Sequence, residues 1–153
     1  QPYMVARTLE LARVPADGRA LDIGTGSGYQ AALLGELAKE VVTIERIPSL
    51  AESARAKLAE LGYDNVEVVV GDGSVGYADR APYDAIVGAA AAPRAPETLK
   101  RQLAIGGRLV LPIGSRTMQR LTVVRRVSAE EFTLEEFEGC IYVPLVGAEG
   151  WSS

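Results

Sequence analysis

Short apolar runs alternate with longer amphipathic stretches over most of the chain. The apolar runs predict strands at residues 20–24, 41–45, 66–70, 85–88 and 108–113. The stretches between them predict helices at residues 28–38, 48–61 and 96–103. Pro48 suits the first turn of a helix, and Gly62 follows the second helix where a left-handed cap is favoured. This alternation is typical of a parallel sheet with helices on both faces.

The pattern changes in the last third of the chain. Gly106 and Gly107 are expected to end the third of these helices and to turn the chain into the fifth strand. After residue 114, long helical periods are absent, and antiparallel strands are predicted at 117–127, 132–137 and 141–145. The expected fold is therefore α/β, with a mostly parallel, doubly wound sheet and an antiparallel C-terminal edge.

Residues 2–13 fit an N-terminal helix whose apolar face carries Val5, Leu9 and Ala12. The 153 residues, 48% of them apolar, suffice for one domain with a substantial core. We find no repeat, low-complexity tract or linker, and we expect residues 1–153 to form a single domain.

Charge and composition limit the kinds of partner that the chain is expected to bind. The 20 acidic and 16 basic side chains are mixed along the chain and give a net charge of −4, which disfavours nucleic acid as a partner. The sequence contains no apolar run long enough for a membrane span and no signal-peptide layout at its start, so we expect a cytoplasmic protein without membrane contact.

Two scarce residue types limit the chemistry. Cys140 is the only cysteine, so the chain can form neither an internal disulfide nor a thiolate metal cluster. The sequence contains no histidine, which removes a histidine-based triad, the usual zinc sites and the commonest general base. We expect no metal site, and a reaction that needs no strong base.

A glycine-rich loop is predicted between the first strand and the first helix after it. Its glycines, Gly24, Gly26 and Gly28, are separated by Thr25 and Ser27, and Asp22 stands two residues before the first. Glycines there let a ligand approach the backbone closely. The spacing differs from the G-x-G-x-x-G of dinucleotide-binding enzymes, which disfavours a nicotinamide-dependent dehydrogenase, and resembles the loop of S-adenosyl-L-methionine (AdoMet) dependent methyltransferases. A tight turn without a ligand is the alternative.

Two further carboxylates follow strands at the same sheet edge. Glu45 ends the second strand about 20 residues after the glycines, where a carboxylate can accept hydrogen bonds from both ribose hydroxyls. Asp72, after the third strand, could accept from an adenine amino group. The alternatives are a solvated acid for Glu45 and an ordinary Asp-Gly turn for Asp72.

Longer motifs carry a more specific likeness. They are QPYMVA at 1–6, DIGTGSGYQ at 22–30, GDG at 71–73, APYDAI at 81–86, GAAAAP at 88–93, GGRLVLPIG at 106–114 and IYVPLVG at 141–147. Together they resemble the protein-L-isoaspartate O-methyltransferase family nearly from end to end. The glycine loop marks only the methyltransferase superfamily, whereas GAAAAP and IYVPL are much more specific. The resemblance implies the Rossmann-like AdoMet-dependent methyltransferase fold.

The resemblance also implies an activity. Such an enzyme repairs damaged proteins by moving a methyl group from AdoMet to the α-carboxylate of an isoaspartyl residue, leaving S-adenosyl-L-homocysteine (AdoHcy). A carboxylate is already ionised near neutral pH, so the catalytic task is alignment of oxygen, methyl and sulfur. By family likeness, the glycine loop with Ser27 holds the methionyl part, Glu45 the ribose, and Asp72 with Gly73 the adenine. Arg46 is also expected among the cofactor-binding residues. Val146 is expected to line the same pocket.

The family's substrate-facing segments give the candidates for holding an isoaspartyl peptide. Ala90 and Ala91 lie among small residues after the fourth strand, and Val143 lies in a segment that could offer a strand edge. Close packing of the alanines, and a core-facing role for residues 141–145, are the alternatives. An adenine amino-methyltransferase would carry an Asn-Pro-Pro-Tyr type loop where these alanines stand, so that class of enzyme is disfavoured.

The sequence departs from the family at its start. The family's catalytic serine would lie before Gln1, so no catalytic residue is assigned within the chain. An AdoMet- or AdoHcy-binding core with little turnover is therefore the alternative function, and a domain of this fold that binds no AdoMet is a third. We expect a monomer, with some risk of association where an upstream region would have covered apolar surface.

Overall fold

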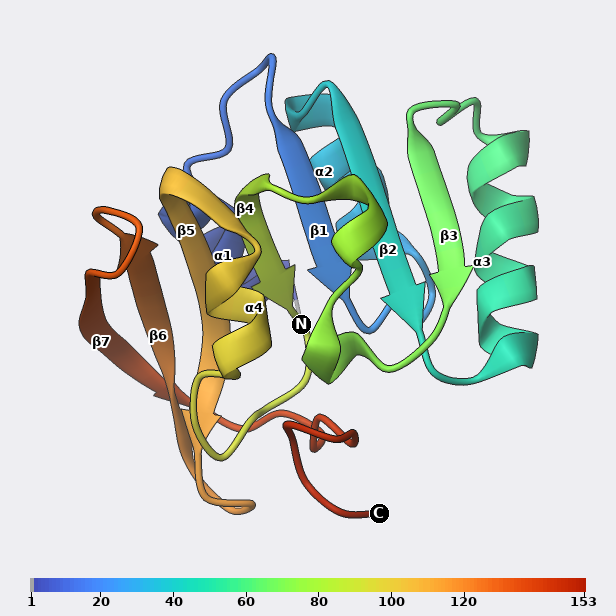
Figure 1. Ribbon diagram of the computed structural model, residues 1–153. Coiled ribbons are helices and arrows are strands. Elements are labelled where there is room, and N and C mark those ends of the chain that lie inside the picture. Colours follow the sequence, from blue (N-terminus) through green and yellow to red (C-terminus); the bar gives the residue numbers. More distant parts are fainter. Residues whose placement is uncertain (1) are drawn as a thin grey trace.

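A seven-stranded sheet forms the centre of the protein, which the computed structural model describes over residues 2–153. The strands are β1 (Arg19–Ile23), β2 (Glu40–Glu45), β3 (Val66–Val70), β4 (Tyr83–Gly88), β5 (Leu103–Gly114), β6 (Gln119–Arg126) and β7 (Phe132–Cys140). Their order across the sheet is β3-β2-β1-β4-β5-β6-β7 (Figure 1). Strands β1 to β5 run parallel, and β6 pairs antiparallel with both β5 and β7. The predicted sheet with its antiparallel C-terminal edge is thus confirmed.

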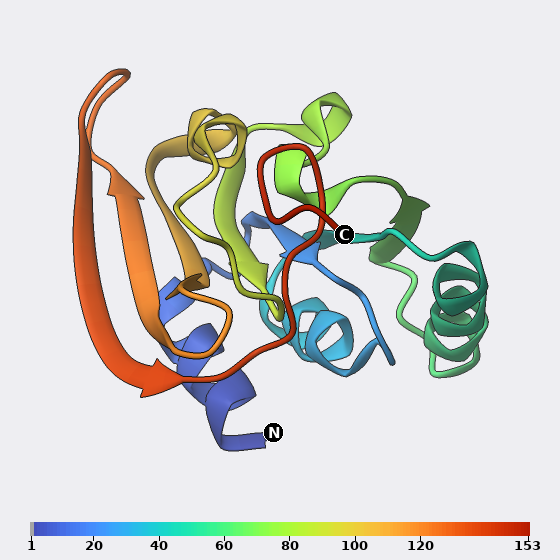
Figure 2. The same ribbon diagram turned by 90° about the horizontal axis from the view of Figure 1, so that it is seen from below.

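Helices cover both faces of this sheet. Three of them, α1 (Pro2–Ala12), α2 (Tyr29–Leu37) and α3 (Pro48–Glu60), lie on one face, and the short α4 (Glu97–Arg101) lies on the other with the 3₁₀ turns η1 (Gly73–Val75) and η2 (Ala78–Arg80) (Figure 2). The buried side chains divide accordingly. Leu34 of α2 packs with Val87 and Val110 of the sheet, whereas Leu99 of α4 packs with Leu21 and Ile86 on the opposite face.

The strand order creates a switch point between β1 and β4. From β1 the chain moves outward through β2 to β3, and it then returns to form β4 on the other side of β1. Connections after β1 and β4 therefore leave the sheet in opposite directions, and open α/β sheets bind ligands in the crevice that results. The residues after these strand ends decide what can bind.

One predicted helix end is wrong. Helix α4 ends at Arg101, before Gly106 and Gly107, and β5 begins at Leu103, which already pairs with Tyr83 of β4. The glycines instead lie in an irregular stretch of β5. A Cβ on Gly107 would lie 2.9 Å from the Tyr83 carbonyl oxygen, so the close approach of the two backbones requires glycine there. Leu103 is fully buried, which explains why the chain enters the sheet so early.

The predicted strand at 141–145 is also absent. Strand β7 continues to Cys140, and the following segment has only an isolated parallel bridge between Ala91 and Pro144. Ile141 and Val143 are 70% and 69% exposed, so the core-facing interpretation fails for them, whereas Leu145 is buried. The segment crosses the ends of the strands and follows none of them.

Helix α1 turns a slightly different face to the sheet from the one predicted. Its buried residues are Met4, Thr8, Leu11 and Ala12, so only Ala12 of the expected apolar face is buried. Thr8 can be buried because its hydroxyl donates to the Met4 carbonyl at 2.8 Å. This rotation leaves Val5 free to contact the site described next.

Candidate functional site

A cavity of about 420 Å³ opens at the carboxyl ends of β1, β2 and β4. The predicted residues that line it are Gly24, Thr25, Gly26, Ser27, Glu45, Arg46, Gly73, Ala90, Val143 and Val146. Segments far apart in the sequence thus meet at one place, next to the switch point of the sheet. Asp22, Gly28, Asp72 and Ala91 were also predicted as site residues but do not line the cavity, and their positions explain why.

The glycine loop forms one wall of the cavity. Gly26 and Gly28 have φ angles of +53° and +88°, which side-chain-bearing residues rarely adopt. Gly28 adopts this conformation as the residue that caps α2, which places it behind the loop and out of the cavity. The backbone of the loop is therefore shaped by its glycines to face the ligand space.

Glu45 joins this loop to the end of β2. Its Oε1 accepts from Gly26 N at 3.0 Å and its Oε2 accepts from Ile47 N at 3.0 Å, and the residue is only 7% exposed. Each carboxylate oxygen has two acceptor sites, so both can still accept from a ligand hydroxyl. The two backbone contacts hold the carboxylate at the cavity wall, as binding of a ribose diol requires.

Asp22 lies beneath the cavity and does not contact it. It is fully buried, and its Oδ1 and Oδ2 accept from Gln30 Nε2 at 2.9 Å and Thr43 Oγ1 at 2.8 Å. Burial raises the pKa of Asp22 to about 6, and the nearby charge of Glu45 acts in the same direction, against the two hydrogen bonds. The Thr43 hydroxyl also contacts Thr25 Oγ1 at 2.6 Å, so Asp22 supports the loop through Thr43.

Asp72 is occupied by the protein's own donors. Its Oδ1 accepts from Ser74 N at 2.9 Å and Ser74 Oγ at 2.7 Å, and its Oδ2 accepts from Ala148 N at 2.8 Å. Burial acts to raise the pKa of Asp72, but these hydrogen bonds outweigh it and the pKa is lowered. The neighbouring Gly73 lines the cavity in place of Asp72. A side chain would not fit at position 73, because a Cβ there would lie 2.6 Å from Ile23.

Two of the three substrate candidates line the cavity. Ala90 and Val143 line it, while Ala91 uses its backbone to hold the C-terminal segment: Ala91 N donates to Val143 O and Leu145 N donates to Ala91 O, both at 2.7 Å. Ala91 is thus a packing and pairing residue at this position, and Val143 remains exposed beside the opening.

Several cavity residues were not among the predicted site residues, namely Ile23, Tyr29, Gln30, Ile44, Ile47 and Leu50. Ala89, Pro144 and Leu145 also line the cavity, and they lie in the two segments that were expected to face the substrate. For two of the unpredicted residues the sequence held a signal, because Ile47 and Leu50 are apolar residues within five positions of the end of β2. In the structure they are 40% and 42% exposed. Such side chains offer an apolar surface for a flat base. Val5 lines the cavity as well. It lies in residues 1–6, which the family likeness places beside the cofactor, and its contact depends on how α1 rotates against the sheet.

Among residues 2–153, no group of three or more histidine, cysteine or carboxylate side chains is arranged to hold a metal ion. No helix in the same part of the chain is long and apolar enough to cross a membrane. The polar groups at the cavity are backbone amides, hydroxyls, the Gln30 carboxamide, the Arg46 side chain and the Glu45 carboxylate.

Comparisons with known proteins point in one direction. The family model for protein-L-isoaspartate(D-aspartate) O-methyltransferase matches residues 1–150. Protein-L-isoaspartate O-methyltransferase 2 of Pelobacter propionicus is 50% identical over 152 residues, covering 99% of this chain and 68% of the relative. Protein-L-isoaspartate O-methyltransferase 1 of Rhodopseudomonas palustris is 51% identical over 154 residues, covering 100% of this chain and 63% of the relative.

Solved structures agree with these relatives. A protein-L-isoaspartate O-methyltransferase superposes with a TM-score of 0.89 at 29% identity, covering 98% of this chain and 49% of that one. A putative member from Plasmodium falciparum, solved with AdoHcy, superposes with a TM-score of 0.78 at 23% identity, covering 95% of this chain and 74% of that one. The second likeness concerns the fold alone.

Proposed function

The chain belongs to the protein-L-isoaspartate(D-aspartate) O-methyltransferase family, and from this premise we propose that it binds AdoMet and transfers the methyl group to the α-carboxylate of isoaspartyl residues in damaged proteins. The chain spans 68% and 63% of the lengths of the two curated relatives above. The observation that carries the proposal is one cavity whose lining joins the glycine loop and Glu45 to Ala90 and the exposed Val143.

The cavity suits AdoMet in size and chemistry. Its volume of about 420 Å³ falls in the range of small-ligand sites. Ile44, Ile47 and Leu50 offer an apolar surface for a base, and Glu45 offers acceptors for hydroxyl groups. When bound, AdoMet supplies a methyl group activated by a positively charged sulfur.

Residues of the chain then have to align two reactants. The isoaspartyl carboxylate is an anion near neutral pH and gives up no proton when its oxygen bonds to the methyl carbon. The carbon–sulfur bond breaks with its electron pair remaining on sulfur, so charge is neutralised and AdoHcy is left. The small side chains of Ala89 and Ala90 leave room for a peptide at the cavity. Holding oxygen, carbon and sulfur in line is the main contribution that this geometry can make.

We further propose that the chain acts as a monomer on isoaspartyl peptides and that nucleic acid is not a partner. The net charge of −4, with acids and bases mixed along the chain, supports the second point, because nucleic-acid binding draws on a basic surface. Analytical ultracentrifugation checks the first point, with a single monomer species expected.

The proposal is tested by pairing calorimetry with a methylation assay. We expect heat of binding with AdoHcy, and incorporation of labelled methyl from AdoMet into an isoaspartyl peptide but not into the same peptide with normal aspartate. Absence of heat would overturn the cofactor site. Heat without methyl incorporation would overturn the transfer step while leaving the cofactor site standing.

A further inference from the structure

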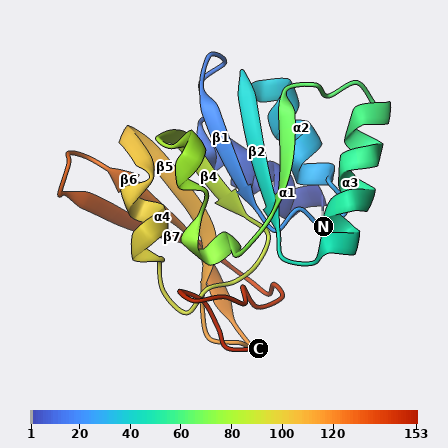
Figure 3. The same cartoon turned by 45° about the vertical axis from the view of Figure 1, so that its right-hand side comes forward.

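The C-terminal strap, which we define as residues 143–151, crosses the carboxyl ends of the strands (Figures 1 and 3). Its first part lines the cavity with Val143, Pro144, Leu145 and Val146. The ladder with Ala91 and the burial of Leu145 hold the strap against the rest of the protein as far as residue 145. The residues after it also bond within the strap, because Gly147 N donates to Trp151 O at 3.1 Å and Trp151 N donates to Leu145 O at 2.7 Å. The position of Val146 therefore depends on what holds the residues after it.

One attachment lies on the turn after β3. Ala148 N donates to Asp72 Oδ2 at 2.8 Å, and Glu149 N donates to Ser74 Oγ at 3.0 Å. A Cβ on Gly147 would lie 2.0 Å from Asp72 Oδ1. The strap backbone thus rests directly on these two side chains.

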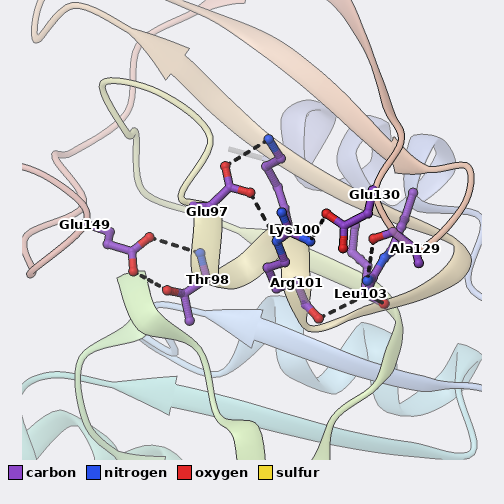
Figure 4. A network of polar contacts seen from close by, with 9 residues as sticks. Glu97, Thr98, Lys100, Arg101, Leu103, Ala129, Glu130 and Glu149 are labelled. Carbon is purple, nitrogen blue, oxygen red and sulfur yellow. Dashed lines mark hydrogen bonds and ion pairs between the residues drawn. The ribbon is translucent and has the colours of Figure 1, made fainter.

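The second attachment is the carboxylate of Glu149. It accepts from Thr98 N at 3.0 Å and from the Thr98 hydroxyl, in the first turn of α4 (Figure 4). These hydrogen bonds lower the pKa of Glu149, so it is charged throughout the neutral range. Helix α4 is a firm support because Leu99 is completely buried in the core.

We propose that Glu149 is a positioning residue for the cofactor, which it never touches. It does not line the cavity, but it ties the far end of the strap to α4 and so keeps Val146 against the ligand space. This inference rests on the proposed function, since AdoMet and AdoHcy are the ligands that Val146 would contact. The two attachments at residues 148 and 149 leave the backbone of Val146 little freedom to move, because it lies only two and three residues before them.

Calorimetry with AdoHcy tests this role. We expect Glu149→Ala to weaken AdoHcy binding about tenfold, because charge-assisted hydrogen bonds to the helix are lost. Glu149→Gln should recover much of the affinity, since its amide oxygen can accept from Thr98 N and its amide group can donate to Thr98 Oγ1. The matched control is Glu130→Ala, because Glu130 contacts Arg101 at the other end of the same helix and is remote from the strap (Figure 4). That variant should bind as the wild type does.

Trp151 gives a second readout that does not depend on turnover. It is the single tryptophan of the chain and lies in the strap, with the Arg116 guanidinium 4.7 Å from its ring centre. We expect Glu149→Ala to raise the quenching of Trp151 emission by acrylamide, and AdoHcy to reverse part of that change. The Glu130→Ala control should leave the emission unchanged.

The outcomes separate the two proposals. If the wild type gives no heat with AdoHcy, the proposed function fails. If the wild type binds and Glu149→Ala binds within about twofold of it, the positioning role is overturned. Should Glu149→Ala fail to fold, Thr98→Val removes only the hydroxyl donor and is expected to weaken binding about threefold. Unchanged affinity and unchanged quenching in Thr98→Val would then overturn the role.

Discussion

Among the acids beside the candidate site, Asp22 has the most strongly shifted pKa, and Asp22→Asn tests whether burial causes that shift. The carboxylate is fully buried and accepts only from Gln30 and Thr43 among the donors around it in residues 2–153. Burial raises its pKa from 3.8 to about 6. An asparagine fits the same space: its oxygen accepts from Gln30, and its amide group donates to Thr43, whose hydroxyl then donates to Thr25.

The sign and size follow from proton linkage. Between the unfolded pKa and the raised folded pKa, the native state holds a proton that the unfolded chain has released. Stability from this group is therefore present at acid pH and is lost as the pH rises through about 6. A rise of about two pH units corresponds to about 3 kcal/mol.

The assay is urea unfolding of the wild type and Asp22→Asn at intervals between pH 4 and 8. The free energy of unfolding of the wild type, minus that of the variant, is expected to fall by about 2.4 kcal/mol between pH 4 and 7, because at pH 4 the unfolded carboxyl is already partly ionised. Subtraction removes the other titrating groups that both proteins share. A difference that stays level across this range would show that Asp22 has an ordinary pKa, and the role assigned to burial would be wrong.

Three other substitutions probe the site and its support. Glu45→Gln turns an amide N–H toward a backbone donor such as Gly26 N, and calorimetry should show AdoHcy affinity reduced about tenfold or more. Gly147→Ala drives a methyl group into Asp72, so both the melting temperature and AdoHcy affinity should fall, as calorimetry can measure. Tyr83→Phe removes a buried hydrogen bond and should cost about 1 kcal/mol in urea unfolding, with AdoHcy affinity unchanged.

Gly147→Ala has a matched control, and each of the three substitutions has a contrary result. Gly139→Ala is the control for Gly147, because a Cβ there meets its nearest neighbour only at 3.6 Å. Equal melting temperatures for the two glycine variants would contradict the close packing of the strap. Wild-type affinity in Glu45→Gln would remove this carboxylate from the ligand site. A loss of AdoHcy binding in Tyr83→Phe would show that this tyrosine acts beyond the core.

The parallel part of the sheet was predictable because each strand is a largely apolar run that ends at or just before a glycine or an acid. Strand β3 has the predicted bounds, Val66–Val70, and α3 begins at Pro48 as its proline indicates. The pattern failed at Gly106, where a positive φ serves an irregular strand and not a helix end. It failed again at residues 141–145, because alternating apolar residues that face a ligand space look the same as a half-buried strand.

The roles of the three acids were harder to predict than their positions. Glu45, Asp22 and Asp72 all stand at or near the carboxyl ends of parallel strands, and a sequence places them equally close to a ligand. What separates them is the source of their donors. Glu45 is held by its neighbouring backbone and still faces the cavity, while Asp22 bonds to Thr43 on the adjacent strand.

Asp72 accepts from its neighbour Ser74 and also from Ala148 N, a donor remote in the sequence that only the folded chain brings close. A strand-end acid therefore has two possible uses, as a ligand contact or as an anchor for a segment that completes the site. In this protein the anchor at Asp72 and the attachment of Glu149 to α4 act on the same strap. Loss of either should thus loosen Val146, and the effects of Gly147→Ala and Glu149→Ala on AdoHcy affinity should be less than additive.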